Sequence, residues 1–491
     1  MKRSAHNLSF YRLLTGSQGQ LLPIGCVEVL PGDTFKHSTS ALIRLAPLAA
    51  PVMHPVHARI HHFYVPTRLI WEDFEDFITG GPDGNDASVF PTKTWSGGNL
   101  VNAGLGSLNN HLGCPPLSSG STEISALPLR AYAMIFNEYY RDQDLQTELT
   151  VSLASGADTT TNVLLQKINW EKDYFTVARP WAQKGSSVTI PVERLSNAAG
   201  VRLYNAGTDT PNTANSTLKD DASGYMTDVG GVTKLSIDPL GGLVITPEDL
   251  RLSMALMRYK EARSQFGSRY TEYLRYLGIR SSDARLQRPE YLGGGQQTIQ
   301  ISEVLQTSPD AASGTTATEG VGNLYGHGIG GMRSNKYLRF FEEHGFVISL
   351  LSVKPRTIYA NALPRMFNRR TKEDFFQREL QHIGQQAILN KEVRVDHASP
   401  NGTFGYGDRY DEYRQTMSQV SGEFSPGGSL TDWHMARIFS SDPALNSTFV
   451  EANPTDRVYT GTTAQQLQIM ANHRLFARRI IDQNGGNNRV F

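Results

Sequence analysis

The chain has 491 residues, of which 39% are hydrophobic and 19% are charged, so it is long enough to bury a large core. Its 47 lysines and arginines balance 47 acids, which excludes a global electrostatic field directed at nucleic acid or membrane. Two cysteines cannot staple so long a chain, and no apolar run suits a secretion signal or a membrane span, so we expect an unexported protein of a reducing compartment.

The first part of the chain predicts short strands joined by turns. Leu22–Leu30 reads as a strand, followed by a Pro-Gly-Asp turn and a new extended piece at Thr34. Ala41–Leu48 and Val56–Val65 are further predicted strands. Phe77–Ser125 is rich in glycine, asparagine, serine and proline, and we interpret it as a long loop.

The middle of the chain predicts one helix and one polar insertion. Apolar residues four apart predict a helix over Leu127–Gln143, and Ser187–Val192 reads as a strand. Residues 201–250 contain seven acids and three bases among many small polar residues. We therefore predict a solvent-facing insertion that covers at least Asn205–Gly231.

Thr246–Gly295 predicts a helical hairpin with a charged exit. Thr246 is a helix N-cap and Pro247 suits the first helical position. Two helices follow, ending at Gly267 and Gly278, and their apolar stripes consist of Leu250, Met254 and Met257 in the first and Tyr270, Tyr273, Leu274 and Leu277 in the second. We expect this hairpin to pack on a sheet or on another subunit.

The remaining elements complete an all-β pattern. Thr298–Leu305 and Gly345–Val353 are predicted strands, and Ser308–Gly322 is a predicted loop. Eight to ten short strands, with long unequal loops and two or three helices, favour one antiparallel sandwich that carries insertions. No repeat of fixed length points to a solenoid or propeller.

Many strings, in colinear order between about residues 20 and 460, are similar to one known family. They include Glu28–Phe35, Phe63–Trp71, Asn137–Gln143, Lys172–Thr176, Pro180–Gly185, Gly267–Glu272, Asp283–Gly293, Asp432–His434 and Asp442–Asn446. Together they resemble the major capsid protein of the Microviridae, small phages with single-stranded DNA, nearest to the gokushovirus-like branch. The resemblance implies a mainly β, eight-stranded antiparallel viral jelly roll. The whole chain 1–491 would then form a single domain, with insertions at about 77–185, 201–234 and 246–295.

The same resemblance implies a structural role without a cofactor or catalysis. It implies self-assembly through pentamers into a T=1 icosahedral shell around circular single-stranded DNA, and attachment to a host. Implied partners are other copies of the chain, the genome, a small basic DNA-associated protein, minor virion proteins and a host receptor, with no insertion in a membrane. The implied location is the virion, assembled in the bacterial cytoplasm. The insertion at 201–234 is short for a threefold protrusion.

Clusters of basic residues supply candidate nucleic-acid contacts. Six lie within 19 residues that contain no acid, with Tyr359 and Phe367 between them, and the N-terminal arm adds three more. Cations neutralise phosphates and aromatic rings stack on unpaired bases. The candidates are Lys2, Arg3, Arg12, Lys354, Arg356, Arg365, Arg369, Arg370 and Lys372; Arg474, Arg478 and Arg479 add charge near the C-terminus. A solvated basic face or salt bridges between subunits explain them equally well.

Other motifs favour ordinary structure over chemistry. Gly326–Gly331 fits G-x-G-x-x-G, but a polar loop precedes it and no helix signal follows, so we interpret it as a flexible loop. His54, His57, His61 and His62 suggest a metal, but Arg59 would share a strand face with two of them and repel a cation. We interpret them as strand or interface histidines. The acid–histidine neighbours at Glu342–His344 and Asp396–His397 are common by chance.

Two other function classes stay open. A β-sandwich carbohydrate-binding protein or enzyme would use exposed Trp71, Trp95 and Trp433 to stack on sugars. Another virion component, such as a spike or scaffolding protein, would purify as a trimer or a transient species.

Overall fold

The computed structural model describes residues 3–97, 104–186, 188, 247–267, 269–305, 307, 324–461 and 465–481, and the backbone of four short strands between 202 and 236. The chain divides into two compact units. The larger comprises Met1–Ala182 and Phe266–Phe491, and the smaller comprises Gln183–Gln265. The predicted strand Ser187–Val192 and loop Ser308–Gly322, and most of the insertion Asn205–Gly231, lie outside the described residues.

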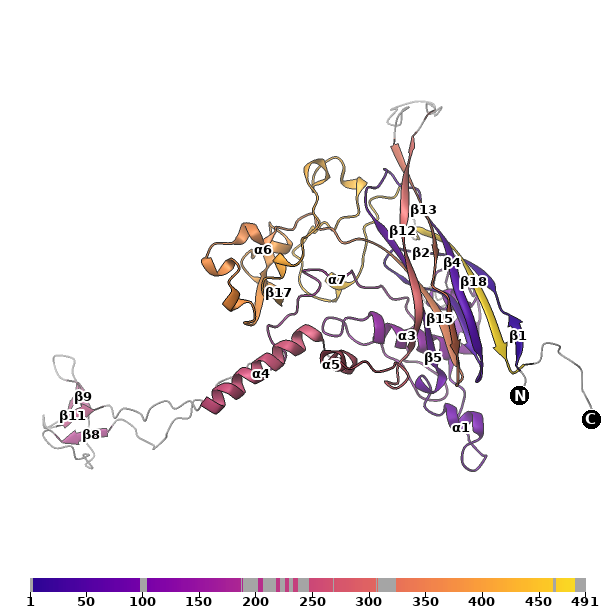
Figure 1. The fold of residues 1–491 in the computed structure, drawn as a ribbon, viewed down its shortest axis with the longest axis horizontal. Helices are drawn as coiled ribbons and strands as arrows, with labels where there is room; N and C mark the ends of the chain where they lie inside the picture. Colours follow the sequence, from indigo (N-terminus) through magenta and orange to yellow (C-terminus); the bar gives the residue numbers. More distant parts are fainter. Residues whose placement is uncertain are drawn as a thin grey trace, which may run out of the picture. The chain divides into compact units, whose positions relative to one another are not determined.

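A curled antiparallel sheet is the framework of the larger unit (Figure 1). Within the described residues it has ten strands, in the order β1-β18-β4-β13-β12-β5-β15-β3, while β2 also pairs with β18 and β14 with β4. Their bounds are β1 Ser4–Asn7, β2 Phe10–Gly16, β3 Leu21–Val29, β4 Thr34–Leu45, β5 Val56–Pro66, β12 Glu290–Leu305, β13 Leu324–Arg333, β14 Tyr337–Phe340, β15 Gly345–Pro355 and β18 Leu467–Arg479.

The ten strands fill the places of an eight-stranded jelly roll. β1 and β2 pair with successive stretches of β18, so together they act as one interrupted strand. β13 and β14 likewise pair with successive stretches of β4. β12 pairs with β5 through Glu290–Ile299 and with β13 through Gln300–Leu305, and thus joins the two halves of the sandwich. The predicted jelly-roll β-sandwich is confirmed.

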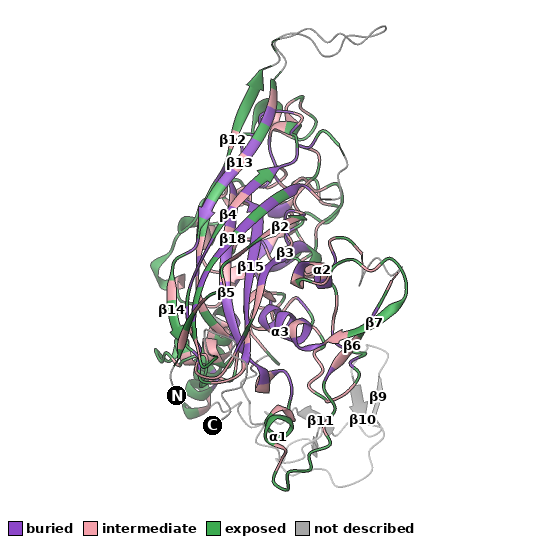
Figure 2. Cartoon of the chain, turned by 90° about the vertical axis from the view of Figure 1, so that its right-hand side faces the viewer, coloured by how far each residue is buried: buried purple, intermediate pink, exposed green. Residues whose placement is uncertain are grey.

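Burial along the strands shows which faces meet the core. β18 alternates buried and exposed residues from Leu467 to Arg478, so one face packs inside the sandwich and the other is at the surface (Figure 2). β15 is buried along nearly its whole length, because helix α3 (Leu127–Ile135) and nearby loops cover its second face. This double burial explains the continuous apolar run seen in the sequence.

The glycine-rich string Gly326–Gly331 is part of strand β13, so its interpretation as a flexible loop is wrong. Alternate glycines face the inside of the sandwich, where no side chain fits. A Cβ on Gly326 would lie 2.4 Å from the carbonyl oxygen of Ala50, and one on Gly328 would lie 2.5 Å from Leu45 Cδ1. Glycine here permits close packing of the sheet instead of a turn.

The segments predicted as loop and helix are largely as expected. Helix α3 continues into a π-helical turn at Phe136–Tyr140, which confirms the predicted helix. The predicted loop Phe77–Ser125 is mostly irregular but also contains short regular elements. These are the end of α1 (Phe74–Thr79), β6 (Thr92–Ser96), α2 (Leu108–Leu112) and β7 (Ser121–Ser125).

Both helices of the predicted hairpin are present. They are α4 (Pro247–Phe266) and α5 (Tyr270–Tyr276), and Gly267 and Gly278 follow them with positive φ. The predicted apolar stripes are exposed, with 56% of Met254 and 65% of Tyr270 accessible. The smaller unit also contains two two-stranded sheets, β8 (Arg202–Asn205) with β11 (Thr233–Ser236) and β9 (Leu218–Asp220) with β10 (Met226–Asp228).

Another cluster of buried side chains is distinct from those of the sandwich strands and includes Phe175, Tyr359, Phe404 and Phe449. Its nearby regular elements are β16 (Gln385–Leu389), β17 (Thr403–Asp408), α6 (Asn390–Val393) and α7 (Ser447–Val450).

Three histidines are buried inside the sandwich at one point. His37, His62 and His473 come from β4, β5 and β18, and each is at most 2% exposed. His37 Nε2 lies 3.1 Å from His473 Nδ1, and the rings of His37 and His62 are 4.8 Å apart. Hydroxyl groups and one carbonyl satisfy the remaining ring nitrogens, so the cluster is a polar layer within an apolar core.

Candidate nucleic-acid interface

The basic residues of the N-terminal arm lie beside those of the C-terminal stretch, because β1 and β2 both pair with β18. Arg3 is exposed, and its guanidinium lies 4.8 Å from the ring centre of Phe340. Arg12 instead donates to the carbonyls of His111 (2.8 Å) and Asn110 (3.4 Å), and burial lowers its pKa. Lys2 lies outside the described residues.

The six basic residues between 354 and 372 do not form one free patch. Lys354 is buried and its Nζ donates to the carbonyl of Asn169 at 2.8 Å. Arg356 is exposed just after β15. The charge of Arg356 is therefore accessible to a ligand in solution, whereas that of Lys354, two residues earlier, is not on the open surface.

Two arginines of the same segment pair with acids that lie later in the chain. Arg365 lies 3.1 Å from Glu392, which is fully buried, and 3.6 Å from Glu412. Arg369 lies 3.6 Å from Glu412, and its guanidinium stacks 4.5 Å from the ring centre of Tyr413. These two arginines stabilise the local fold, and acids of this chain already compensate their charges.

The other two residues of the segment are open to solvent. Arg370 donates to neighbouring backbone carbonyls and stays exposed. The Lys372 side chain is 88% exposed, with Glu373 3.8 Å away. Of the six, Arg356, Arg370 and Lys372 are thus exposed.

A larger basic surface lies on the outer face of one half of the sandwich. The strands β1, β2, β4, β13, β14 and β18 contain no aspartate or glutamate. Exposed cations occupy this face and the turn beside it, and none of them forms an ion pair within the described residues. They are Lys36, Arg44, Arg333, Lys336, Arg474 and Arg478. We call this surface the basic sheet face.

Strand register brings these cations together with apolar side chains. Lys36 of β4 lies opposite Phe476 of β18, and Arg333 of β13 lies opposite Ser40 of β4. Phe476 is 52% exposed and Tyr11, on the adjoining β2, is 71% exposed. A surface that combines aromatic rings with cations binds single-stranded nucleic acid without sequence preference.

The electrostatics of Lys336 show how close these charges are. Lys36 above all, and then Arg333 and Arg474, lower the pKa of Lys336, because each positive neighbour disfavours another positive charge. Like charges gathered without acids repel one another, and an anionic partner relieves that repulsion. Sequence reasoning named Arg474 and Arg478 but missed Lys36, Arg44, Arg333 and Lys336. The signal that could have found them is that segments with the alternating pattern of strands contain no acids.

The other candidate motifs carry ordinary structural roles. His61 donates to or accepts from the Tyr140 hydroxyl at 2.7 Å, and Glu343 pairs with Arg68 at 2.6 Å. Among the described residues, no group of three or more His, Cys, Asp or Glu is arranged to hold a metal. In the same part of the chain no helix is both long and apolar enough to cross a membrane.

The tryptophans proposed to stack on sugars are not exposed as that alternative required. Trp71 is fully buried and donates to the Ser155 hydroxyl at 2.8 Å, and Trp95 is only 6% exposed. Trp433 is partly buried. The expectation of exposed rings at Trp71 and Trp95 is wrong, and Trp71 packs in a cluster of buried side chains with residues of α2 and α3.

Comparisons with known proteins agree with the fold. A family model described as "Capsid protein (F protein)" matches residues 1–481. The chain is 35% identical to capsid protein VP1 of Bdellovibrio phage phiMH2K, over 93% of this chain and 89% of the relative. It is 31% identical to capsid protein VP1 of Chlamydia phage 1, over 93% and 90% of the two chains. It is 28% identical to capsid protein VP1 of Spiroplasma virus 4, over 88% and 84%.

Proposed function

Because the chain belongs to the capsid protein (F protein) family of the Microviridae, we propose that many copies of it close, through pentamers, into a T=1 icosahedral shell around circular single-stranded DNA. The chain is a structural component of the virion and not an enzyme. The match over residues 1–481 carries the proposal, since it spans the sandwich and its insertions. A small basic DNA-associated protein, minor virion proteins and a host receptor are the further partners, and the bacterial cytoplasm is the place of assembly.

Exposed apolar side chains support contacts between copies. Five in the segment after β15 are each at least half exposed, namely Met366, Phe367, Phe375, Phe376 and Ile383. Large apolar side chains exposed this closely along one segment favour a site of association. In a closed shell symmetry repeats each such contact, so contacts that are individually weak add up.

The basic sheet face is the surface we assign to the genome. Its cations have no acidic partners among the described residues, whereas Arg365 and Arg369 already pair with acids. Cations of this kind bind phosphates, while Tyr11 and Phe476 offer flat faces to unpaired bases. The exposed residues Arg3, Arg356, Arg370 and Lys372 remain secondary candidates for the same role.

Electron microscopy of the purified full-length protein, with measurement of its nucleic-acid content, tests the function. We expect uniform closed particles when the protein is expressed, and packaged single-stranded DNA when the phage genome is present. A trimer or a small soluble oligomer at every concentration tried would contradict the shell.

Charge reversal separates the two candidate DNA surfaces. One variant carries Lys36→Glu, Arg44→Glu, Arg333→Glu and Arg474→Glu on the basic sheet face. All four positions are exposed, so we expect particles to form but to hold much less DNA. For unassembled protein binding single-stranded DNA, the slope of log affinity against log salt should fall by about 3, at ~0.7 per lost phosphate contact.

A second variant provides the matched comparison. It carries Arg356→Glu, Arg370→Glu, Lys372→Glu and Arg378→Glu, which are equally exposed but lie after β15. We expect its DNA content and salt slope to fall clearly less than those of the sheet-face variant. If this variant loses DNA while the sheet-face variant keeps it, the genome lies on the 354–372 segment instead. Arg369 is unsuitable for either set because reversal would break its pair with Glu412.

We assign host attachment to the polar insertion at about 201–234. Its location in a compact unit of its own, Gln183–Gln265, supports a surface role. Shortening Asn205–Gly231 should leave particle yield unchanged and reduce adsorption to host cells, measured as free phage after mixing. Failure to form particles would identify the insertion as a contact between subunits.

A further inference from the structure

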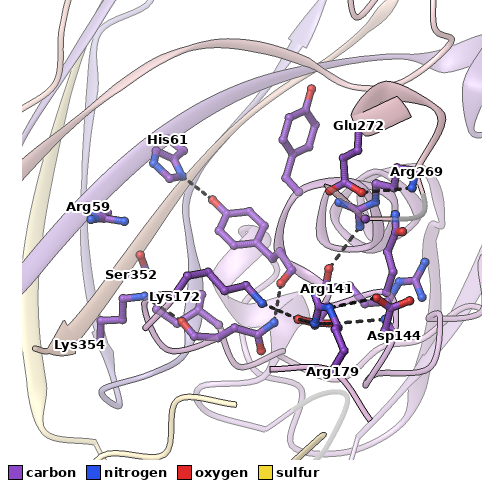
Figure 3. A pocket seen from close by; sticks show the side chains of 17 residues that line it. Arg59, His61, Arg141, Asp144, Lys172, Arg179, Arg269, Glu272, Ser352 and Lys354 are labelled. Carbon is purple, nitrogen blue, oxygen red and sulfur yellow. Dashed lines mark hydrogen bonds and ion pairs between the residues drawn. The ribbon is translucent and has the colours of Figure 1, made fainter. Parts of the chain in front are cut away.

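A charged pocket of about 360 Å³ lies under β5 and β15, away from the basic sheet face (Figure 3). Arg59 and His61 project from β5, and Ser352 and Lys354 from β15, on the outer face of that half of the sandwich. The opposite wall is formed by residues 139–144 after α3, by the loop 168–179, and by the start of α5. All of these residues belong to the larger compact unit.

Cations outnumber acids in this lining. The cations are Arg59, Arg141, Lys172, Arg179, Arg269 and Lys354, whereas the acids are Asp142, Asp144 and Glu272. His61 adds no positive charge at neutral pH, because burial lowers its pKa to about 4. Two acids outside the lining also pair with it, Glu171 with Arg59 and Glu148 with Arg141, so the lining cations without an ion pair among the described residues are Lys354 and Arg269.

The two aspartates of the lining already form ion pairs with neighbouring cations. Asp142 accepts from Lys172 at 2.5 Å and lies 3.3 Å from Arg179, and Asp144 also lies 3.3 Å from Arg179. Burial alone would raise the pKa of Asp142, but Lys172 and Arg179 outweigh it and lower that pKa. Both aspartates thus pair with Lys172 and Arg179 and do not compensate the other cations of the pocket.

Two cations of the lining, the buried Lys354 and the half-buried Arg269, form no ion pair within the described part of the chain, although Glu138 and Glu272 lie near enough to Arg269 to favour its charged form. Lys354 is only 8% exposed and gives one of its three N–H donors to the carbonyl of Asn169. Its neighbour Glu171 pairs with Arg59 at 2.8 Å. Arg269 donates to the carbonyls of Asn137 and Arg141, which are neutral acceptors. Burial lowers the pKa of both cations, that of Lys354 to about 8.

A buried cation without a counter-ion is costly, and an anion that enters beside it removes that cost. Arg141 adds a buried Nε that has no hydrogen-bond acceptor within the described residues, and the Ser352 hydroxyl faces the same space. Donors thus converge from β15, from the segment after α3 and from α5. A doubly charged tetrahedral oxyanion can accept from several directions at once, which a carboxylate with a single charge cannot match.

We propose that this pocket is a binding site for a phosphate group, held by Lys354 and Arg269 from opposite walls. Its size accommodates a free phosphate, a nucleoside monophosphate or one phosphate of a polynucleotide. The site is separate from the basic sheet face and does not depend on shell formation. It also gives Lys354, one of the cations singled out in the sequence, a defined anionic partner.

Calorimetric titration of the purified full-length protein tests the site. The probes are inorganic phosphate, deoxyadenosine 5′-monophosphate and an oligothymidine, each at constant ionic strength. We expect saturable binding of phosphate at one site per chain, and at least a tenfold loss of affinity in Lys354→Met. Lys372→Met is the control, because that side chain is 88% exposed and lies outside the pocket.

Protonation supplies an independent readout. Lys354 must be charged to hold phosphate, so binding above pH 8 should take up a proton, detectable as heat that depends on the buffer. The charged and titratable groups that face Lys354 are Arg59 and His61 of β5, Tyr140, and Glu171 and Lys172 of the loop. Of these, His61 titrates far below this range.

Each outcome decides the proposal. Binding of phosphate and the monophosphate alone supports a free ligand, and binding of all three probes with the same Lys354 dependence supports a DNA phosphate. Absence of saturable phosphate binding, or equal affinity in Lys354→Met and wild type, overturns the site. If Lys354→Met does not fold, Arg269→Gln, which retains a donor for Asn137, should show the same loss.

Discussion

Replacing Arg130 with methionine should destabilise the protein by about 3–5 kcal/mol, because it leaves Asp158 buried without its counter-ion. Both side chains are completely buried, and Arg130 Nε lies 2.8 Å from Asp158 Oδ2. Arg130 also donates to the carbonyls of Ile70 (3.0 Å) and Ala154 (2.9 Å). The pair therefore ties helix α3 to two loops that cover the sheet.

The surroundings of Asp158 favour its ionised form. Burial would raise its pKa, but hydrogen bonds from the hydroxyl and backbone N–H of Thr161, together with Arg130, lower it instead. An isolated carboxylate at this place would lose its strongest partner and keep its full desolvation cost. We expect a lower urea midpoint of unfolding and few or no particles from Arg130→Met.

An exposed ion pair of the same length provides the control. Arg339 lies 2.8 Å from Glu290, but its side chain is 51% exposed, so Arg339→Met should cost less than about 1 kcal/mol. The double variant Arg130→Met with Asp158→Leu should be more stable than Arg130→Met alone, since no charge is left unpaired. Equal midpoints for Arg130→Met and Arg339→Met would show that the buried pair does not hold this part of the fold.

Acidification should destabilise the sandwich through its three buried histidines. Burial lowers the pKa of His37 to about 3 and of His473 to about 4, and it lowers that of His62 as well. In the unfolded chain these rings take up protons near pH 6.5. The stabilisation is thus complete above pH 6.5 and is lost progressively as the pH falls toward 4.

At pH 5 each neutral buried ring should account for a loss of about 2 kcal/mol relative to pH 7.5. No acid is among the hydrogen-bond partners of these rings in the described chain, so nothing nearby stabilises a charged form. Urea unfolding at the two pH values measures the effect, although His54, His61 and His111 add to it because burial also lowers their pKa.

The contribution of one ring is isolated by a difference between pH values. In His37→Gln the loss of stability between pH 7.5 and pH 5 should shrink by about 2 kcal/mol, whatever the variant's absolute stability. An unaltered pH dependence in His37→Gln would mean that the buried ring accommodates a proton.

Much of the architecture was predictable from local patterns. The strands β3, β5 and β15, the helix after Leu127 and the helices at 247–276 lie where alternation, helical spacing and caps placed them. The error at Gly326–Gly331 has a clear physical reason. Several glycines close together in sequence are the usual mark of a loop, and only the packing of Ala50 and Leu45 against β13 shows why a strand needs them.

The residue types and their spacing were enough to predict an antiparallel sandwich. A strand with one buried face has apolar and polar side chains in alternation, and this alternation is visible in the sequence. The residue types also identified the basic residues. Tertiary structure alone decided which charges stay free, because ion pairs act over about 4 Å while the partners lie far apart in sequence. Arg365 and Arg369 meet Glu392 and Glu412, whereas pairing of β4 with β18 brings Lys36 and Arg474 to one surface whose strands contain no acid.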